Sequence, residues 1–291
     1  MCRLAAFPPG TGKTLALEIA KTLEGSNVDG VGTSHVLDNQ FVIKKFPIPL
    51  TKAIEQRLDL FDHMPHNGWT TLHTRLATHG EQTDENTHPF EIGDYSFSHN
   101  GVWSDSELCR FALTGHVAFK GETDSEVAGY FFNRYGPEAF SKCINRGGVF
   151  LGLHRSGELH VVKTYGDLEI LSWHAKDDPE SHDGLFFLAS EFKDRKKQEE
   201  RVRKVDTGYI KFSSSGAILE RNAKLEKPYR YDRYDSSNGY LQFPNGGYGR
   251  HQHRGSSCTV ERSVKTEQKK ETSINFWQLD PDNYQVEMIG E

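Results

Sequence analysis

A cysteine stands in second place in this chain of 291 residues, directly after a methionine. A small residue at position 2 usually lets the initiator Met1 be removed, and Cys2 would then carry both a thiol and a free α-amine. The amine, with a reference pKa of about 7.7–8.0, can take the proton of a thiol whose reference pKa is about 8.5. Threonine paired with its own terminal amine works in this way. Cys2 is therefore a candidate nucleophile, although a cysteine here can also be an incidental buried thiol.

Short polar motifs follow Cys2 along the chain. They are NVDGVG (27–32), LHTRLATHG (72–80), HPF (88–90), SHNG (98–101), TDSE (123–126) and ASE (189–191). Each motif alone is common. In this order they resemble the class II glutamine amidotransferases, a family of N-terminal-nucleophile hydrolases, and the resemblance extends from Cys2 to about residue 212.

The resemblance assigns roles that suit the chemistry of glutamine, a zwitterion with an amide at its far end. Arg75 matches the clamp for the α-carboxylate, because a planar guanidinium can bind both oxygens. Asp124 matches the site for the α-ammonium, although its position also suits a helix N-cap. Asn100 and Gly101 match the oxyanion hole, through a side-chain NH2 and a backbone N–H. Without the other motifs, Asn-Gly would indicate a type I′ turn.

Further residues are placed in the substrate pocket by the same resemblance. Asp29 and Gly30 match a loop near the nucleophile, where glycine allows a close backbone approach. Thr78, His79 and Gly80 are expected to line the glutamine pocket.

Histidines are tempting as general bases, but the family uses the terminal amine. We therefore expect His79 and His99 to serve packing or hydrogen bonding. His251 and His253 form an HxH pair, and two ligands without a third support no metal site. No metal and no cofactor are expected.

The segment PPGTGKT at 8–14 resembles a phosphate loop followed by a helix. A full phosphate loop requires Gly, four residues and then Gly-Lys-Ser/Thr. Phe7 occupies the position of the first glycine, and only six residues precede it, barely enough for the strand that should lead into the loop. Nucleotide binding is therefore the weaker interpretation, and the resemblance already implies a strand, a loop and a helix here.

Composition limits the function classes. Acidic residues outnumber basic ones 41 to 35, and the net charge is −6, so neither bulk polyanion binding nor a nucleic acid partner is expected. Interleaved Tyr and Arg at 229–254 could stack on nucleic acid, but a flexible spacer is favoured. No apolar run of ~18 residues and no signal peptide are present, which predicts no membrane association and a cytoplasmic location. The four cysteines lack CxxC spacing and fit reduced thiols.

Hydrophobic patterning predicts more strands than helices. Strands are predicted at 2–7, 41–46, 69–76, 93–98, 149–153, 158–164, 167–173, 185–190 and 207–212, with Gly157 in a hairpin turn. Helices are predicted at 11–24, capped by Thr11, and at 51–61, 104–113, 124–134 and 137–145. Leu15, Ile19 and Leu23 are expected on the buried stripe of the first helix. This pattern fits an α+β domain, and the resemblance implies the four-layer αββα sandwich of the N-terminal-nucleophile hydrolases.

Composition changes near residue 223. Residues 1–222 are predicted to form the amidotransferase domain, and 223–291 a Tyr/Gly/Arg-rich linker or tail with a short apolar end at 276–288. The charged run 193–204 is expected to be a solvated loop or helix face.

The expected function is release of ammonia from glutamine through a γ-glutamyl thioester on Cys2. Glutamine is the substrate, and the partner would be an ammonia-accepting synthase on another chain. One alternative is a lone amidohydrolase that cuts a different γ-glutamyl amide. Another is a non-catalytic binding module of the same fold, and an ATPase comes last.

Overall fold

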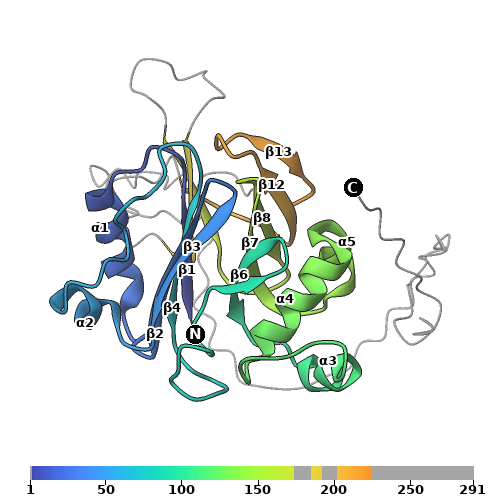
Figure 1. Ribbon diagram of the computed structural model, residues 1–291. Helices are drawn as coiled ribbons and strands as arrows, with labels where there is room; N and C mark the ends of the chain where they lie inside the picture. Colours follow the sequence, from blue (N-terminus) through green and yellow to red (C-terminus); the bar gives the residue numbers. More distant parts are fainter. Residues whose placement is uncertain (1, 174–184, 192–201, 224–291) are drawn as a thin grey trace, which may run out of the picture. The chain divides into compact units, whose positions relative to one another are not determined.

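Two antiparallel sheets and five helices make up the described part of the protein (Figure 1). The structure is a computed structural model that describes residues 2–173, 185–191 and 202–223. Helices α1 (Lys13–Glu24) and α2 (Leu50–Glu55) lie on one side of the paired sheets. Helices α3 (Ser106–Leu113), α4 (Asp124–Tyr135) and α5 (Pro137–Cys143) lie on the other. The layers therefore follow the order αββα, as predicted.

Sheet A has the strand order β11-β9-β10-β1-β4-β2-β3. Its strands are β1 (Arg3–Phe7), β2 (Gly30–Leu37), β3 (Gln40–Phe46), β4 (Thr70–Arg75), β9 (Glu169–Trp173), β10 (Leu185–Ala189) and β11 (Val202–Lys204). The first strand of the chain thus lies inside the sheet, between β4 and β10. Cys2 directly precedes β1, so its position is fixed by the pairing of β1 with these two strands.

Sheet B has the order β13-β12-β8-β7-β6-β5. Its strands are β5 (Phe90–Ile92), β6 (Tyr95–Gly101), β7 (Gly148–His154), β8 (Leu159–Lys163), β12 (Gly208–Phe212) and β13 (Ile218–Arg221). The hairpin between β7 and β8 turns at Gly157, whose φ of 88° suits glycine. That turn was predicted from the sequence.

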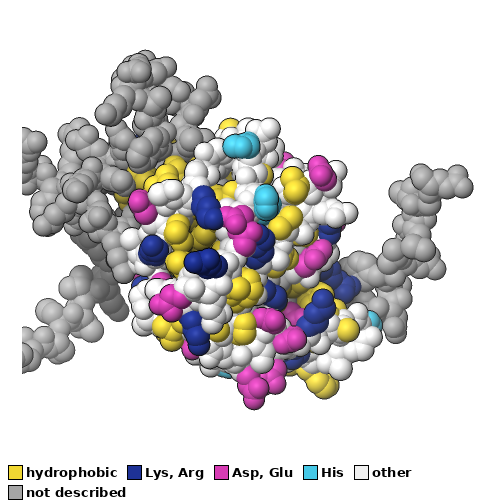
Figure 2. All heavy atoms as spheres, turned by 60° about the vertical axis from the view of Figure 1, so that its left-hand side comes forward, with side chains coloured by type: hydrophobic (Ala, Val, Ile, Leu, Met, Phe, Trp, Pro, Cys, Tyr) yellow, Lys and Arg dark blue, Asp and Glu magenta, His cyan; other side chains and the backbone are white. Residues whose placement is uncertain are grey.

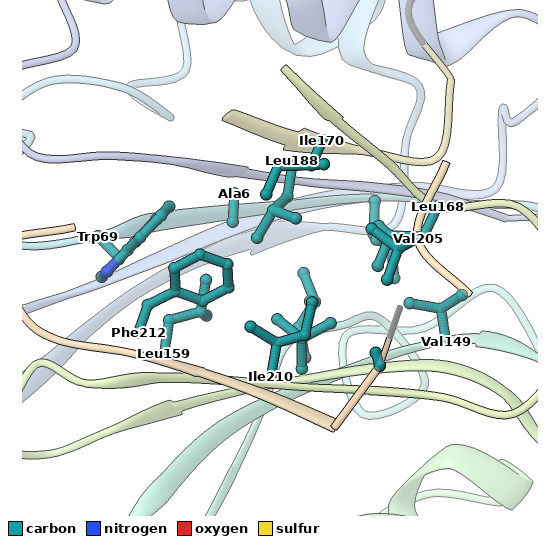
Figure 3. Close-up of a cluster of buried hydrophobic side chains, with 14 of the residues drawn as sticks. Ala6, Trp69, Val149, Leu159, Leu168, Ile170, Leu188, Val205, Ile210 and Phe212 are labelled. Atoms are coloured by element: carbon teal, nitrogen blue, oxygen red, sulfur yellow. The ribbon is translucent and has the colours of Figure 1, made fainter. Parts of the chain in front are cut away.

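The central core lies between the sheets (Figure 3). Ala6 and Leu188 of sheet A lie opposite Ile210 and Phe212 of sheet B, and all four are buried. The Trp69 ring meets Phe212 edge-on at 5.2 Å between centroids. Helices cover the outer face of each sheet and the other sheet covers its inner face, so β4, β6 and β7 are buried along nearly their whole length.

Several predicted boundaries were wrong. The helix predicted over 51–61 ends at Glu55, and Arg57 adopts a φ of 55°. Residues after it turn inward instead, so that Phe61 packs edge-on against Phe7. The N-cap of α1 is Gly12, not Thr11, whose hydroxyl donates to Pro8 O.

The predicted buried stripe of α1 is also shifted. Leu15 is 36% exposed, whereas Leu23 is buried and Ile19 is half-buried. Ala16 and Ala20 supply the rest of the buried face. Small alanines let the helix approach sheet A closely, and a search for large apolar residues overlooks them.

Strand β2 was not predicted, because its sequence GVGTSHVL is rich in glycine and polar residues. Its polar side chains Thr33, Ser34 and His35 are nevertheless buried, and Ser34 is bonded between the sheets. Ser34 Oγ lies 2.7 Å from Thr71 Oγ1 of β4, and Ser96 Oγ of β6 donates to Ser34 Oγ at 2.7 Å. Tertiary hydrogen bonds thus replace apolar contacts in this part of the interface.

Three short strands also differ from the predictions. The strand predicted at 93–98 corresponds to β6, which begins at Tyr95 and continues to Gly101, whereas β5 before it was missed; a turn at Gly93 joins the two. Strand β13 was missed. The end of the charged run 193–204 forms β11, which pairs with β9 at the edge of sheet A, and the rest of that run lies outside the described residues.

The predicted tail at 223–291, with His251 and His253, lies outside the described residues except for its first position. Ala223 is buried, and its N–H donates to Tyr209 O at 3.3 Å. The packed chain therefore extends through Ala223. Among the described helices, none has the length and apolar character needed to cross a membrane.

Candidate functional site

The Cys2 thiol lies against the backbone that follows β4. Leu76 N–H donates to Cys2 Sγ at 3.3 Å, and the thiol donates to Leu76 O at 3.4 Å. Burial raises the pKa of the Cys2 thiol, while the Leu76 N–H and the charge of Arg75 oppose this rise. The resting thiol is therefore protonated near neutral pH and needs a base before it can attack.

Arg75, the last residue of β4, has its guanidinium surrounded by backbone carbonyls of the loop that follows. Its Nη2 donates to His79 O (2.8 Å) and Gly80 O (3.1 Å), and its Nη1 donates to Glu81 O (3.0 Å). These bonds use three of the five N–H donors of the group. Arg75 thus organises residues 76–81, and a substrate carboxylate would bind the remaining donors or displace a carbonyl.

Asp29 fixes the other side of the same loop. Its Oδ2 accepts a bond from Ala77 N–H at 2.7 Å, and its own N–H donates to Arg75 O at 3.0 Å. Gly30 begins β2, and a Cβ there would lie 3.1 Å from the Thr87 side chain. The sequence motif around Asp29 therefore lies next to the loop that contacts Cys2.

Asn100 and Gly101 end β6 and pair with Val149 and Gly148 of β7. They are not the turn of a hairpin, so the alternative interpretation of Asn-Gly is wrong. A Cβ on Gly101 would lie 2.0 Å from Gly147 O. Only glycine therefore fits at this point of the sheet.

A serine links Asn100 to the strand that follows Cys2. Asn100 Nδ2 donates to Ser190 Oγ at 3.2 Å, and Leu4 N–H donates to the same oxygen at 3.0 Å. Asn100 Oδ1 is buried and has no hydrogen-bond partner among the described residues. Ser190 thus anchors the side-chain NH2 of Asn100, which keeps a second N–H that this bond does not use.

Asp124 begins α4 and lines a pocket of about 110 Å³ with His79, Trp103 and Arg110 among others. Its Oδ2 accepts a bond from Trp103 N–H at 2.7 Å. The N-cap of α4 is Thr123, whose Oγ1 accepts from Glu126 N–H. The suggestion that Asp124 also caps the helix is wrong, and its carboxylate is left to face the pocket.

Thr78 and His79 lie exposed in the loop, with His79 Nδ1 3.4 Å from Thr78 Oγ1. Gly80 follows with a φ of 74°. The structure brings these residues beside Arg75 and places His79 at the pocket that Asp124 lines.

His99 is a packing residue, as predicted. Its ring stacks on Phe150 at 4.4 Å between centroids. Its Nδ1 lies 2.9 Å from Ser125 Oγ, and its Nε2 lies 2.9 Å from Gly147 O. Burial lowers the pKa of His99, and both nitrogens are occupied, so the ring is not placed to serve as a general base.

Sequence reasoning missed the side chains that hold the loops around this site. Glu126 accepts bonds from Lys120 N–H (2.8 Å) and Gly121 N–H (2.9 Å). Arg110 donates to Gly121 O and Thr123 O, and Asn86 bonds Glu122 N–H. Such contacts to backbone atoms leave no spacing pattern. Ser190 lies in a recognised motif, but no role was assigned to it.

Comparisons with known proteins find relatives that match part of the chain. The chain is 34% identical over 116 residues to the glutamine–fructose-6-phosphate aminotransferase (isomerizing) of Vibrio vulnificus, which is 39% of this chain and 18% of that protein. It is 36% identical over 130 residues to the enzyme of that name in Corynebacterium diphtheriae, which is 41% of this chain and 20% of that protein. The chain thus spans about a fifth of the length of these curated relatives. No family model matches it.

Among solved structures, the chain resembles the glutamine phosphoribosylpyrophosphate amidotransferase of B. subtilis complexed with ADP and GMP. The TM-score is 0.58 at 16% identity, over 78% of this chain and 49% of that one. An allosteric regulatory enzyme of purine biosynthesis gives 0.59 at 17% identity, with the same coverage. At these identities the likeness concerns the fold.

Proposed function

The chain belongs to the class II glutamine amidotransferases, and on this premise we propose that it hydrolyses the side-chain amide of glutamine with Cys2 as the nucleophile. The observation that carries the proposal is the position of the Cys2 thiol. It contacts Leu76, at the start of the loop that Arg75 organises. The side-chain NH2 of Asn100 is tied through Ser190 Oγ to Leu4 N–H, two residues after Cys2.

The reaction begins when the free α-amine of Cys2, exposed by removal of Met1, takes the proton of the thiol. The thiolate attacks the amide carbon of glutamine and forms a C–S bond. Asn100 Nδ2 and Gly101 N–H stabilise the oxyanion of the tetrahedral intermediate. The α-ammonium of Cys2 then returns its proton to the amide nitrogen of glutamine, the C–N bond breaks and ammonia departs.

A γ-glutamyl thioester remains on Cys2. Water, deprotonated by the same amine, attacks the thioester carbon and releases glutamate and the thiol. Arg75 and Asp124 hold the α-carboxylate and α-ammonium and so reject simple amides. Asp124 supports this assignment because its carboxylate lines the pocket.

The ammonia either leaves as the final product or reaches an acceptor site. We propose that such an acceptor site belongs to a synthase; the chain itself spans about a fifth of the length of its curated relatives.

The test compares the unmodified protein with Cys2→Ala in a glutamine hydrolysis assay. We expect activity to fall below detection, while Cys109→Ala, which removes another free thiol, leaves it unchanged. Intact mass spectrometry should show that Met1 is absent from active protein. The glutamine mimic 6-diazo-5-oxo-norleucine should label Cys2 in peptide maps. Label on Cys109 or Cys143, or full activity with Met1 retained, would refute the mechanism.

A further inference from the structure

One buried carboxamide joins the two loops that border the pocket. Asn86 is 3% exposed. Its Nδ2 donates to Glu81 O at 3.2 Å, and its Oδ1 accepts a bond from Glu122 N–H at 2.8 Å. A single amide thus bonds the loop after Arg75 on one side and the turn before Asp124 on the other.

Glycines on both loops allow this close approach. A Cβ on Gly80 would lie 2.8 Å from Asn86 Nδ2, and one on Gly121 would lie 2.5 Å from Asn86 Oδ1. Real Cβ atoms do not come so near. The carboxamide therefore lies between two backbone segments with no room for a side chain, which makes the spacing of the loops depend on Asn86.

The two loops are otherwise held by separate groups. Arg75 binds the carbonyls of residues 79–81. Arg110 and Glu126 bind the backbone of residues 120–123. Each loop is thus fixed on its own side, and Asn86 bonds both.

We propose that Asn86 is a positioning residue that sets the distance between Arg75 and Asp124, and thereby the affinity for the amino-acid end of glutamine. The inference deepens the proposed function and rests on it. The α-carboxylate and the α-ammonium of an amino acid are attached to one carbon, so their partners must keep a fixed separation. A loosened spacing weakens both contacts together.

Catalysis at the thiol depends on other contacts. Cys2 is held by Leu76, and Asn100 is held by Ser190. Loss of Asn86 should therefore raise the KM for glutamine while kcat changes little. A merely destabilised protein would instead lose active molecules and lower kcat at constant KM.

Two substitutions separate the two bonds. Asn86→Asp keeps an acceptor for Glu122 N–H but puts a carboxylate oxygen against Glu81 O, so it frees the 79–81 loop alone. Asn86→Ala removes both bonds. We expect KM to rise about tenfold in Asn86→Asp and more in Asn86→Ala, with kcat within about twofold, as loss of one or two buried hydrogen bonds implies.

A matched control exists on α4. Asn133 Oδ1 accepts a bond from Asp94 N–H at 3.0 Å, and its side chain lies against Gly93 in the same manner. It holds the turn between β5 and β6. Asn133→Ala should leave KM unchanged. The rate at which iodoacetamide alkylates Cys2, followed by peptide mapping, should be equal in the unmodified protein and all three variants.

Hydrogen exchange gives a readout that does not need turnover. In Asn86→Ala, amide protection should fall in both 79–81 and 120–123. In Asn86→Asp it should fall in 79–81 alone, and in Asn133→Ala in neither. Unchanged protection in Asn86→Ala, or an unchanged KM in an active enzyme, would overturn the proposal. An unmodified protein that does not hydrolyse glutamine would instead refute the proposed function, and the exchange data would still decide whether Asn86 couples the loops.

Discussion

Two glycine-containing loops follow neighbouring strands of sheet A, and they are built in opposite ways. Residues 8–12 follow β1 and residues 76–81 follow β4; the two strands are antiparallel neighbours, so the loops lie at opposite ends of the sheet. A Cβ at Gly10 or Gly12 would meet no atom within 4 Å. A Cβ at Gly80 would collide with Asn86.

The basic residues beside the two loops, Lys13 and Arg75, also differ in their surroundings. Lys13, after the first loop, is exposed and pairs with Asp62. Figure 2 shows the face that α1 and α2 help to form, where Lys and Arg are interspersed with Asp and Glu. Arg75 is 2% exposed and bonds three carbonyls. A glycine-rich motif thus indicates a binding loop only where packed groups fix its backbone.

Arg75→Lys should give the largest effect of the changes that test this comparison. An ammonium cannot reproduce the contacts of the planar guanidinium to the loop or to a carboxylate. We expect KM for glutamine to rise about 30- to 100-fold, or about 2–3 kcal/mol, with a smaller fall in kcat. Steady-state kinetics measures both, and an unchanged KM would remove Arg75 from the site.

Acid should destabilise the folded protein through histidines buried in both sheets. Burial lowers the pKa of His73 on β4 to about 3, and that of His160 on β8 to about 4. Above about pH 6.5 these histidines are neutral in both folded and unfolded states. Below it the unfolded chain binds protons that the folded protein does not, so stability is lost as pH falls towards the folded pKa values.

The loss is at most about 1.4 kcal/mol per pH unit for each histidine. Urea unfolding at pH 7.0, 6.0 and 5.0 measures it. His160→Gln should reduce the dependence of the unfolding free energy on pH by the contribution of one histidine. His116→Gln, at an exposed position, should leave that dependence unchanged. Equal stability at pH 7.0 and 5.0 would contradict the assignment of neutral buried rings.

Ser190→Ala should have a smaller effect, on kcat. It removes the oxygen that bonds Asn100 Nδ2 and Leu4 N–H, so the oxyanion donor loses its anchor. We expect kcat to fall about tenfold, or about 1.4 kcal/mol, with KM nearly unchanged. Ser190→Thr, which keeps the hydroxyl, should restore part of the rate. A rise in KM alone would show that Ser190 acts on substrate binding instead.

Lys13→Ala should have the smallest effect. The Lys13–Asp62 pair is exposed, and such pairs contribute less than about 1 kcal/mol. Glutaminase activity should stay within about twofold, and calorimetric titration should detect no micromolar ATP binding before or after the change. Tight, Mg-dependent binding of ATP that is lost in Lys13→Ala would show that residues 8–14 are a phosphate loop.

Sequence alone could predict the parts of the fold with strong local signals. The apolar runs of β7 and β8 and their turn at Gly157 were recognised, as was α4. The ordered motifs also brought Cys2, Arg75 and Asp124 into one hypothesis before any geometry was known. Apolar runs and turns are local signals, and the order of the motifs along the chain can be read directly from the sequence.

The rest depended on contacts between distant segments. Strand β2 is specified by buried hydroxyls such as Ser34, whose partners Thr71 and Ser96 come 37 and 62 residues later. Asn86 gave no signal, because it bonds backbone atoms that every residue has. The sequence predicted that Arg75 binds the α-carboxylate of glutamine. It did not predict the bonds of Arg75 to the carbonyls of residues 79–81, because these too are backbone atoms.

The position of β1 inside sheet A has a consequence for synthesis on the ribosome. Residues 3–7 emerge first, but their neighbours are residues 70–75 and 185–189. The bond between Leu4 N–H and Ser190 Oγ spans 186 residues. The edge of β1 that faces β4 can therefore pair early, whereas the edge that faces β10 must stay unpaired until most of the domain has been translated. Until then Ser190 cannot link Leu4 to Asn100, so the side chain proposed to stabilise the oxyanion is not yet tied to the strand that follows Cys2.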